Sequence, residues 1–210
     1  NNISNPDSVE KIHRAYIEAG ADIIQTNTYA AKKCQLKTYG YEDKFEEINI
    51  RAAEIARKAA GENTFVFGTI GAIRGLRECE LSLETIVKET LDQVKVLLST
   101  DKIDALLFET YYDQEEICAV LTEVRKLTDL PIITNISLLE AGITQNGEKV
   151  TDALSALVNL GADIVGLNCH LGPYHMIKSL KQVPLFAQSY LSAYPNASLL
   201  QLTQTIHGNE

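Results

Sequence analysis

The stretch that decides the fold is Gly161-Ala-Asp-Ile-Val-Gly-Leu-Asn-Cys-His-Leu-Gly-Pro173. An apolar run, Ile164–Leu167, leaves a Gly-Ala-Asp turn and leads to Cys169, and a Gly-Pro turn with the start of a helix follows. In parallel α/β proteins, catalytic and binding groups gather at the carboxyl ends of the strands. The stretch therefore predicts a buried strand that delivers one thiol to such an end, as a candidate metal ligand or nucleophile.

The same phrase occurs elsewhere in the chain. Gly20–Thr28 aligns without a gap with Gly161–Cys169, and Asp104–Thr110 is a looser copy that keeps the aspartate, the apolar run and a polar end. Each copy follows a helical pattern, so the chain repeats a unit of helix, turn and buried strand. The repeat predicts a ring of polar groups at one mouth, made of Asn27, Thr28, Glu109, Thr110, Asn168 and Cys169.

Six apolar segments alternate with helical patterns along the chain. Strands without polar interruptions suit a parallel sheet that is covered on both faces. This alternation fits a (β/α)8 TIM barrel or a doubly wound open sheet. Polar residues at nearly every strand end favour the barrel, as does the lack of a Gly-x-Gly-x-x-Gly motif after any strand. Six strands leave such a barrel two short, with two open edges. The expected strands are Ile23–Tyr29, Thr64–Ile70, Ala105–Phe108, Pro131–Leu138, Ile164–Leu167 and 189–194.

Composition limits the class of protein. The 210 residues suit one domain, and 45% hydrophobic with 22% charged residues suits a globule with a sizeable core. A net charge of −9 argues against nucleic acid and anionic membrane surfaces as partners. We see no membrane-spanning run and no signal peptide. The four cysteines are widely spaced, which indicates reduced thiols in a cytoplasmic protein.

Four motifs in order resemble one known family. They are Glu18–Thr28, Leu107–Thr110, Gly166–His170 and Ala193–Ser198, and together they are similar to the homocysteine S-methyltransferase domain over essentially the whole chain. The last motif looks most like bacterial proteins in which this domain is fused to a methylenetetrahydrofolate reductase domain. The resemblance implies a TIM barrel, here residues 1–210 as a single partial domain that lacks the first and eighth strands.

The resemblance also implies a site. In the family, three cysteine thiolates hold zinc, and the homocysteine sulfur becomes the fourth ligand and is methylated to give methionine. Cys169 matches the first zinc cysteine, and Glu109 matches the acidic residue that binds the substrate's amino group. Asn196 matches an asparagine near the polar end of the substrate, and Asn27 and Thr28 match the motif that lines the same mouth. The fused bacterial proteins imply a methylated folate as methyl donor.

The chain departs from this pattern at both ends. The family's Asp-Gly-Ala-Met-Gly-Thr first strand is absent, as is its adjacent cysteine pair, and Leu199–Glu210 contains no cysteine. One of three zinc ligands is present, so the chain looks truncated or part of something longer. A catalytically inactive barrel module that serves as a folding or interaction fragment is the alternative. A phosphate-binding barrel enzyme would need a glycine-rich loop near its last strands, and nothing after Gln182 offers one.

Each candidate residue also has a purely structural interpretation. Taken alone, Cys169 is more often a small buried hydrophobic residue than a ligand. Glu109 must be either solvated in the mouth or paired, because burying an unpaired carboxylate is costly. Asn196 fits a turn, and Asn27 and Thr28 fit residues that satisfy backbone groups at a strand end.

Other thiols and imidazoles are weaker candidates. Cys34, Cys79 and Cys118 lack the spacing of metal ligands, so we interpret them as structural or incidental. His170 follows Cys169, but neighbouring residues of a strand point to opposite sides, which argues against a second ligand there.

Overall fold

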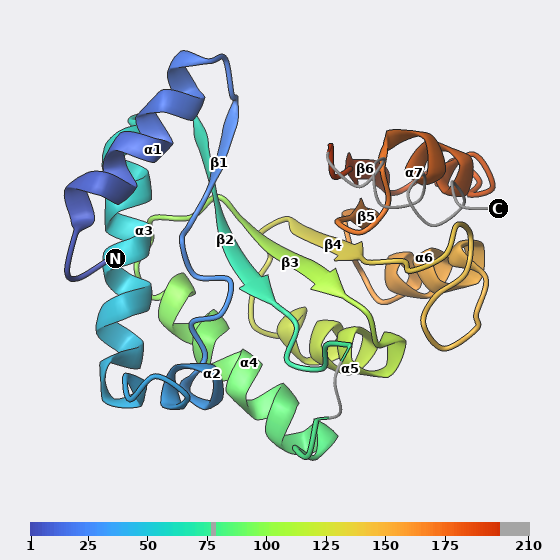
Figure 1. Ribbon diagram of the computed structural model, residues 1–210, viewed down its shortest axis with the longest axis horizontal. Helices are drawn as coiled ribbons and strands as arrows, with labels where there is room; N and C mark the ends of the chain where they lie inside the picture. Colours follow the sequence, from blue (N-terminus) through green and yellow to red (C-terminus); the bar gives the residue numbers. More distant parts are fainter. Residues whose placement is uncertain (77–78, 198–210) are drawn as a thin grey trace, which may run out of the picture.

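The computed structural model describes residues 1–76 and 79–197 and contains one parallel sheet. The strands follow the order β1-β2-β3-β4-β5-β6 and curl into a half-barrel, with helices on the outer side (Figure 1). This confirms the predicted alternation and the count of six strands. No pairing joins β1 to β6 in the described part of the chain. The strands are β1 Ile23–Gln25, β2 Phe65–Gly71, β3 Ala105–Tyr111, β4 Ile132–Ile136, β5 Ile164–Asn168 and β6 Tyr190–Tyr194.

The helices begin where the sequence provides capping residues. The side chains of Asn5, Ser82 and Asp113 each accept a hydrogen bond from a backbone N–H of the first turn, which satisfies a donor that has no partner inside the helix. Within residues 1–76 and 79–197, no helix is long and apolar enough to cross a bilayer. The helices are α1 Pro6–Glu18, α2 Lys33–Lys37, η1 Glu42–Lys44 (3-10), α3 Phe45–Ala60, α4 Leu83–Leu98, α5 Gln114–Val124, α6 Val150–Asn159 and α7 Pro173–Leu180.

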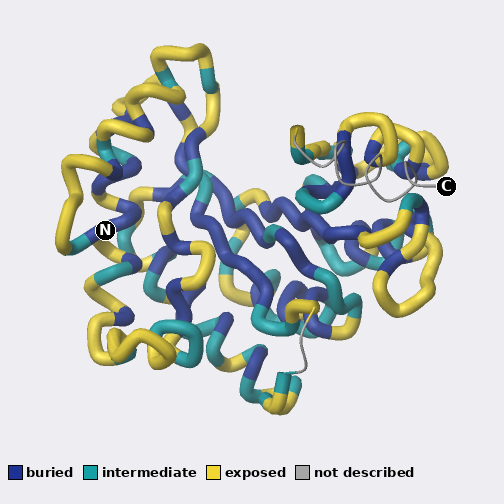
Figure 2. The backbone as a smooth tube through the Cα atoms, viewed as in Figure 1, coloured by how far each residue is buried: buried dark blue, intermediate teal, exposed yellow. Residues whose placement is uncertain are grey.

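The sheet buries apolar side chains on both faces, but not evenly. Its outer face packs against the helices and forms the main core (Figure 2). On the concave face, Leu107 and Ile133 of the central strands are almost fully buried. Towards the two edges the same face is open, since Phe65 is 59% exposed and Tyr190 78% exposed. A curled sheet shields only the middle of its concave face, which explains this gradient.

The repeated aspartate locks the amino ends of the strands together. Asp104, just before β3, accepts the N–H of Val66 at 2.7 Å and pairs with Arg57 at 2.6 Å. Asp163, just before β5, accepts the N–H of Ile132 at 2.8 Å. In each case the carboxylate binds the first residues of the neighbouring strand. The repeated aspartates Asp104 and Asp163 therefore fix the register of neighbouring strands at the amino ends of the sheet. The polar residues of the repeat lie at the carboxyl ends.

Candidate active site at the carboxyl ends of the strands

A bulge at the end of β3 turns two consecutive residues towards the mouth of the half-barrel. The register with β4 shifts between Phe108 and Tyr111, and both of these rings lie in the helix-side core, edge to face at 6.1 Å. Regular strands alternate between faces, but here three steps along β3 match two steps along β4, so β3 contains one extra residue and two residues stand between the rings where one would suffice. These are Glu109 and Thr110, and Thr110 has a backbone φ of 62°.

Cys169 lies just beyond β5, on the same mouth. Its φ is 59° and that of His170 is 47°, so the chain leaves the strand through two left-handed residues. The Cys169 N–H donates to the carbonyl of Tyr194 at 3.1 Å, which anchors the turn to β6. The sulfur is half-buried and accepts contacts from the Thr110 hydroxyl at 3.8 Å and the Asn168 amide at 3.6 Å. It therefore faces polar groups and is not sealed among aliphatic side chains.

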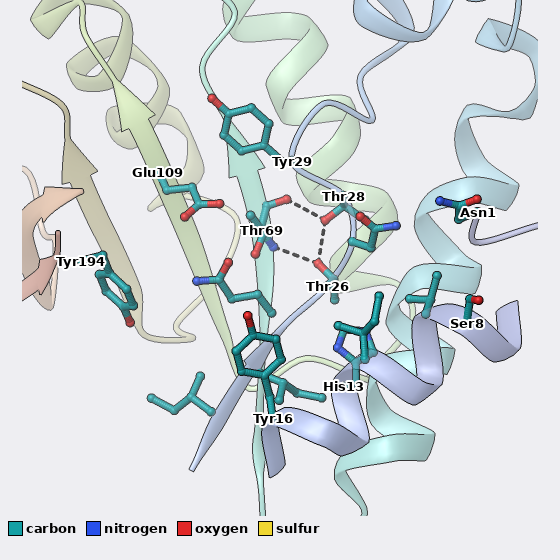
Figure 3. Close-up of a pocket in the computed structure, with 16 residues that line it drawn as sticks. Asn1, Ser8, His13, Tyr16, Thr26, Thr28, Tyr29, Thr69, Glu109 and Tyr194 are labelled. Carbon is teal, nitrogen blue, oxygen red and sulfur yellow. Dashed lines mark hydrogen bonds between the residues drawn. The ribbon is translucent and has the colours of Figure 1, made fainter. Parts of the chain in front are cut away.

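Glu109 lines a pocket of about 690 Å³ that extends from this mouth along β1 to α1 (Figure 3). Tyr29 of the segment after β1, Thr69 of β2 and Tyr194 of β6 line the same pocket. Burial raises the pKa of the Glu109 carboxyl group. Burial also raises the pKa of Tyr194, and the nearby Glu109 adds to this effect. A carboxylate that is partly desolvated and has room in front of it is suited to bind a cationic group.

Thr28 and Asn27 line this pocket too, but their polar groups have partners within the protein. The Thr28 hydroxyl donates to the carbonyl of Thr69 at 2.7 Å and lies 2.6 Å from the Thr26 hydroxyl, which ties the ends of β1 and β2 (Figure 3). The Asn27 amide donates to the side chain of Asn2 at 2.8 Å. These contacts fit the structural interpretation, and a role in substrate binding stays a prediction for both residues.

Comparison with known proteins identifies the family. A sequence model described as homocysteine S-methyltransferase matches residues 1–209. The chain belongs to the homocysteine S-methyltransferase family. It is 32% identical to methionine synthase of Mycobacterium leprae and 30% identical to methionine synthase of Mycobacterium tuberculosis, each over 94% of the chain. The chain spans only 17% and 18% of the lengths of these relatives.

Solved structures show the same fold. The metallated form of the homocysteine methyltransferase MmuM from Escherichia coli superposes with a TM-score of 0.81 at 21% identity. That alignment covers 97% of this chain and 77% of MmuM. The apo form of MmuM superposes with a TM-score of 0.73. At this level of identity the likeness shows the fold alone and leaves the roles of individual residues open.

The segment of Asn196 is bonded to the turn that follows Cys169. The Asn196 N–H donates to the carbonyl of Leu171 at 3.2 Å, so the segment after β6 is tied to the turn that carries Cys169. The structure thus brings Asn196 and Cys169 to one region, while contact of the Asn196 amide with substrate stays a prediction. Ser198, the last residue of the motif, and Leu199–Glu210 lie outside the described residues.

Zinc held by cysteines needs several thiolate ligands around the metal. In the described residues, Cys169 is the one thiol at this mouth. Across residues 1–76 and 79–197, no group of three His, Cys, Asp or Glu side chains could hold a metal ion. His170 packs its ring edge-on against Tyr112 at 5.4 Å. Since β5 ends at Asn168, strand alternation does not govern His170, and our reason for setting it aside was wrong. Cys169 fits one thiolate position, and the described residues do not complete a three-thiolate site.

Sequence reasoning missed two pocket residues and one buried cation. Tyr29 directly follows the Thr26–Thr28 motif, and Tyr194 lies within the Ala193–Ser198 motif, so both positions carried a signal. Aromatic residues next to predicted strand ends were the clue that could have found them. Lys32, three residues after Tyr29, is fully buried. Nothing in the sequence distinguishes it from Lys33, because lysine is ordinarily exposed.

Proposed function

We propose that this domain binds homocysteine at the mouth of the half-barrel and presents its thiol for methylation, which gives methionine. The carrying observation is that Glu109 and Cys169 reach the same mouth, since Thr110, the neighbour of Glu109, contacts the Cys169 sulfur. Homocysteine has an ammonium group at one end and a thiol at the other. A carboxylate and a thiol site on one mouth match these two ends.

The roles of the residues follow from their surroundings. Glu109 would accept charge-assisted hydrogen bonds from the substrate ammonium group, which offsets the cost of its own burial. Tyr29 and Tyr194 flank this carboxylate and would exclude water from the bound amino acid. In the same proposal Asn196, Asn27 and Thr28 contact the polar end of the substrate, Asn196 from the segment tied to the Cys169 turn.

We propose Cys169 as one thiolate ligand of zinc; the two companion cysteine ligands are absent from this sequence and would come from a longer protein that contains the domain. When bound, zinc would keep the sulfur of homocysteine in the nucleophilic thiolate form near neutral pH. Within this chain, the task of the left-handed turn at Cys169 and His170 is to hold the sulfur at the mouth. The three other cysteines stay outside this role, because they lack the spacing of metal ligands.

The biological setting is part of the proposal. A domain that spans under a fifth of its methionine synthase relatives suits one module of a larger enzyme. We propose a methylated folate as methyl donor, a fused reductase domain as partner, and the reducing cytoplasm as location. The last point rests on the four free cysteines, which include Cys169. The alternative is an inactive barrel module. The observation that supports it is that this chain contains one of the three thiolate ligands.

The test uses the complete protein that contains the domain. Methionine formation is measured from homocysteine and methyltetrahydrofolate, together with zinc per chain. We expect activity and close to one zinc per chain, and loss of both in Cys169→Ser. Glu109→Gln should lose homocysteine binding and keep zinc. Absence of homocysteine binding by the zinc-loaded wild type would overturn the proposal, and a bound homocysteine that never becomes methionine would support the inactive module.

A further inference from the structure

Both the oxygen and the nitrogen of the Asn168 side-chain amide form hydrogen bonds with a single residue, Thr110, which lies on a strand that does not pair with β5. Its Oδ1 accepts the backbone N–H of Thr110 at 2.8 Å, and its Nδ2 donates to the Thr110 hydroxyl at 2.7 Å. Asn168 lies on β5 and Thr110 on β3, so the contact crosses over β4. Both residues are buried. We refer to this pair of hydrogen bonds as the Asn168–Thr110 clasp.

The clasp holds Thr110 in a backbone conformation that threonine avoids. A φ of 62° is common for glycine but an outlier for a β-branched residue, and it costs about 1–3 kcal/mol. The clasp offsets this cost with two buried hydrogen bonds, of about 1 kcal/mol each. Glycine would fit the same backbone without strain. A threonine here therefore points to a use for its hydroxyl.

The hydroxyl is directed at the Cys169 sulfur. Because the Thr110 oxygen accepts the hydrogen bond from Asn168, its own proton is free to point to Sγ, 3.8 Å away. The second N–H of the Asn168 amide lies 3.6 Å from the same sulfur. Two donors thus converge on one sulfur atom from two strands, and the backbone of Cys169 is fixed by the carbonyl of Tyr194.

We propose that Asn168 and Thr110 are positioning residues, which fix the Cys169 sulfur at the mouth so that the homocysteine thiol is recognised there. This inference rests on the proposed function and deepens it. Groups that orient a ligand residue typically contribute 10- to 100-fold to affinity or activity. The clasp also explains why the bulge in β3 turns both Glu109 and Thr110 inwards, since one serves the ammonium end and the other the thiol end.

The experiment separates the hydroxyl from the backbone strain with three variants at one position. Thr110→Ser keeps the hydroxyl, Thr110→Val keeps the shape and the strain but loses the hydroxyl, and Thr110→Gly loses the hydroxyl and relieves the strain. For the complete protein, calorimetry measures the Kd of homocysteine and of norvaline, in which a methyl group replaces the thiol. Denaturant unfolding measures stability in parallel.

We expect wild type to prefer homocysteine over norvaline, and Cys169→Ser to lose that preference. Thr110→Ser should keep it. Thr110→Val and Thr110→Gly should lose it about 10-fold or more, although Thr110→Gly is at least as stable as wild type. Asn168→Asp, which removes both amide donors, should behave like Thr110→Val. Norvaline affinity should be unchanged in every Thr110 variant, because it depends on Glu109.

The outcomes distinguish this inference from the proposed function. If wild type shows no preference for homocysteine, the proposed function fails and the clasp has no role in it. If wild type shows the preference and Thr110→Gly retains it, the clasp proposal is overturned while the proposed function stands. If affinity follows stability across the three variants and not the presence of a hydroxyl, Thr110 is merely structural and the clasp proposal is again overturned.

Discussion

The ring of Tyr29 occupies the space that a side chain on Gly71 would need. A β-carbon at Gly71 would lie 2.5 Å from Cε2 of Tyr29, closer than real contacts allow. The Gly71 N–H also donates to the Tyr29 carbonyl at 3.0 Å, so backbone and ring are both fitted to this glycine. Gly71 thereby sets how deeply Tyr29 sits at the end of β2, next to the pocket of Glu109.

The first prediction follows from this fit. Gly71→Ala should push the Tyr29 ring towards the pocket and raise KM for homocysteine about 10-fold, equivalent to about 1.4 kcal/mol, with a smaller effect on kcat. Steady-state kinetics measures both. Gly75→Ala is the matched control, because no atom of residues 1–76 and 79–197 lies within 4 Å of a β-carbon there. The double variant Gly71→Ala, Tyr29→Ala should regain part of the loss, and a wild-type KM in the single variant would contradict the argument.

Glu109 should carry the recognition of the ammonium group. Glu109→Gln keeps the shape and removes the charge, so homocysteine affinity should fall about 10- to 100-fold, as expected for a hydrogen bond between charged groups of about 1.5–3 kcal/mol. Calorimetric titration measures the Kd. Glu46→Gln removes an exposed carboxylate on α3 and should leave affinity unchanged. Equal affinities of wild type and Glu109→Gln would exclude Glu109 from the substrate site.

Burial of Glu109 also predicts a pH dependence. Its pKa is raised above the ordinary value of 4.5, so on acidification it takes up a proton earlier than an exposed glutamate does. Only the ionised form attracts an ammonium group, and affinity should therefore fall as pH drops through this raised pKa. Kd measured in steps from pH 7 towards 4.5 should show the loss in wild type. Glu109→Gln should show no such step.

The sequence predicted the sheet because burial and periodicity leave a clear pattern. The apolar run Ala105–Phe108 predicted β3, which the structure extends to Tyr111. The site was harder, because it depends on backbone that breaks the pattern. Thr110 gives no warning of a positive φ, since glycine is the usual signal for that conformation. The bulge and the clasp were therefore invisible in the sequence.

Gly166 should be essential for the pairing of β5 with β6. A β-carbon there would lie 2.1 Å from the backbone carbonyl oxygen of Ser192, which cannot turn aside as a side chain can. Gly166→Ala should cost about 3 kcal/mol in the free energy of unfolding, at the upper end for overpacking, measured by urea denaturation. The nearest atoms to a β-carbon at Gly68 are ends of side chains, first Cδ1 of Ile103 at 2.9 Å, so Gly68→Ala should cost about 1 kcal/mol. Similar losses in both variants would show that β6 yields easily.

Lys32 holds the carboxyl end of β2. Its ammonium group is fully buried and donates to the carbonyl of Gly71. From the other side, the buried carboxylate of Glu116 accepts the N–H groups of Ile73 and Arg74, each at 2.8 Å. Burial lowers the pKa of Lys32 to about 8, and the attraction of Glu116 limits the drop. The two buried charges thus fix the backbone on which the Tyr29 ring rests.

This lowered pKa links stability to pH. In the folded state Lys32 releases its proton near pH 8, whereas the unfolded chain keeps it until about 10.5. Between these values the unfolded state binds more protons, so the contribution of Lys32 makes the protein more stable as pH rises. From pH 8 to 9 this gain should be about 1 kcal/mol, and Lys32→Met should lack it. Urea denaturation at both pH values measures the difference between the two proteins.

The comparison stops at pH 9 because burial raises the pKa of Cys34 to about 11, and ionisation of this thiol in the unfolded chain lowers stability as pH rises above 9. If wild type and Lys32→Met change equally over this interval, Lys32 does not carry the buried charge.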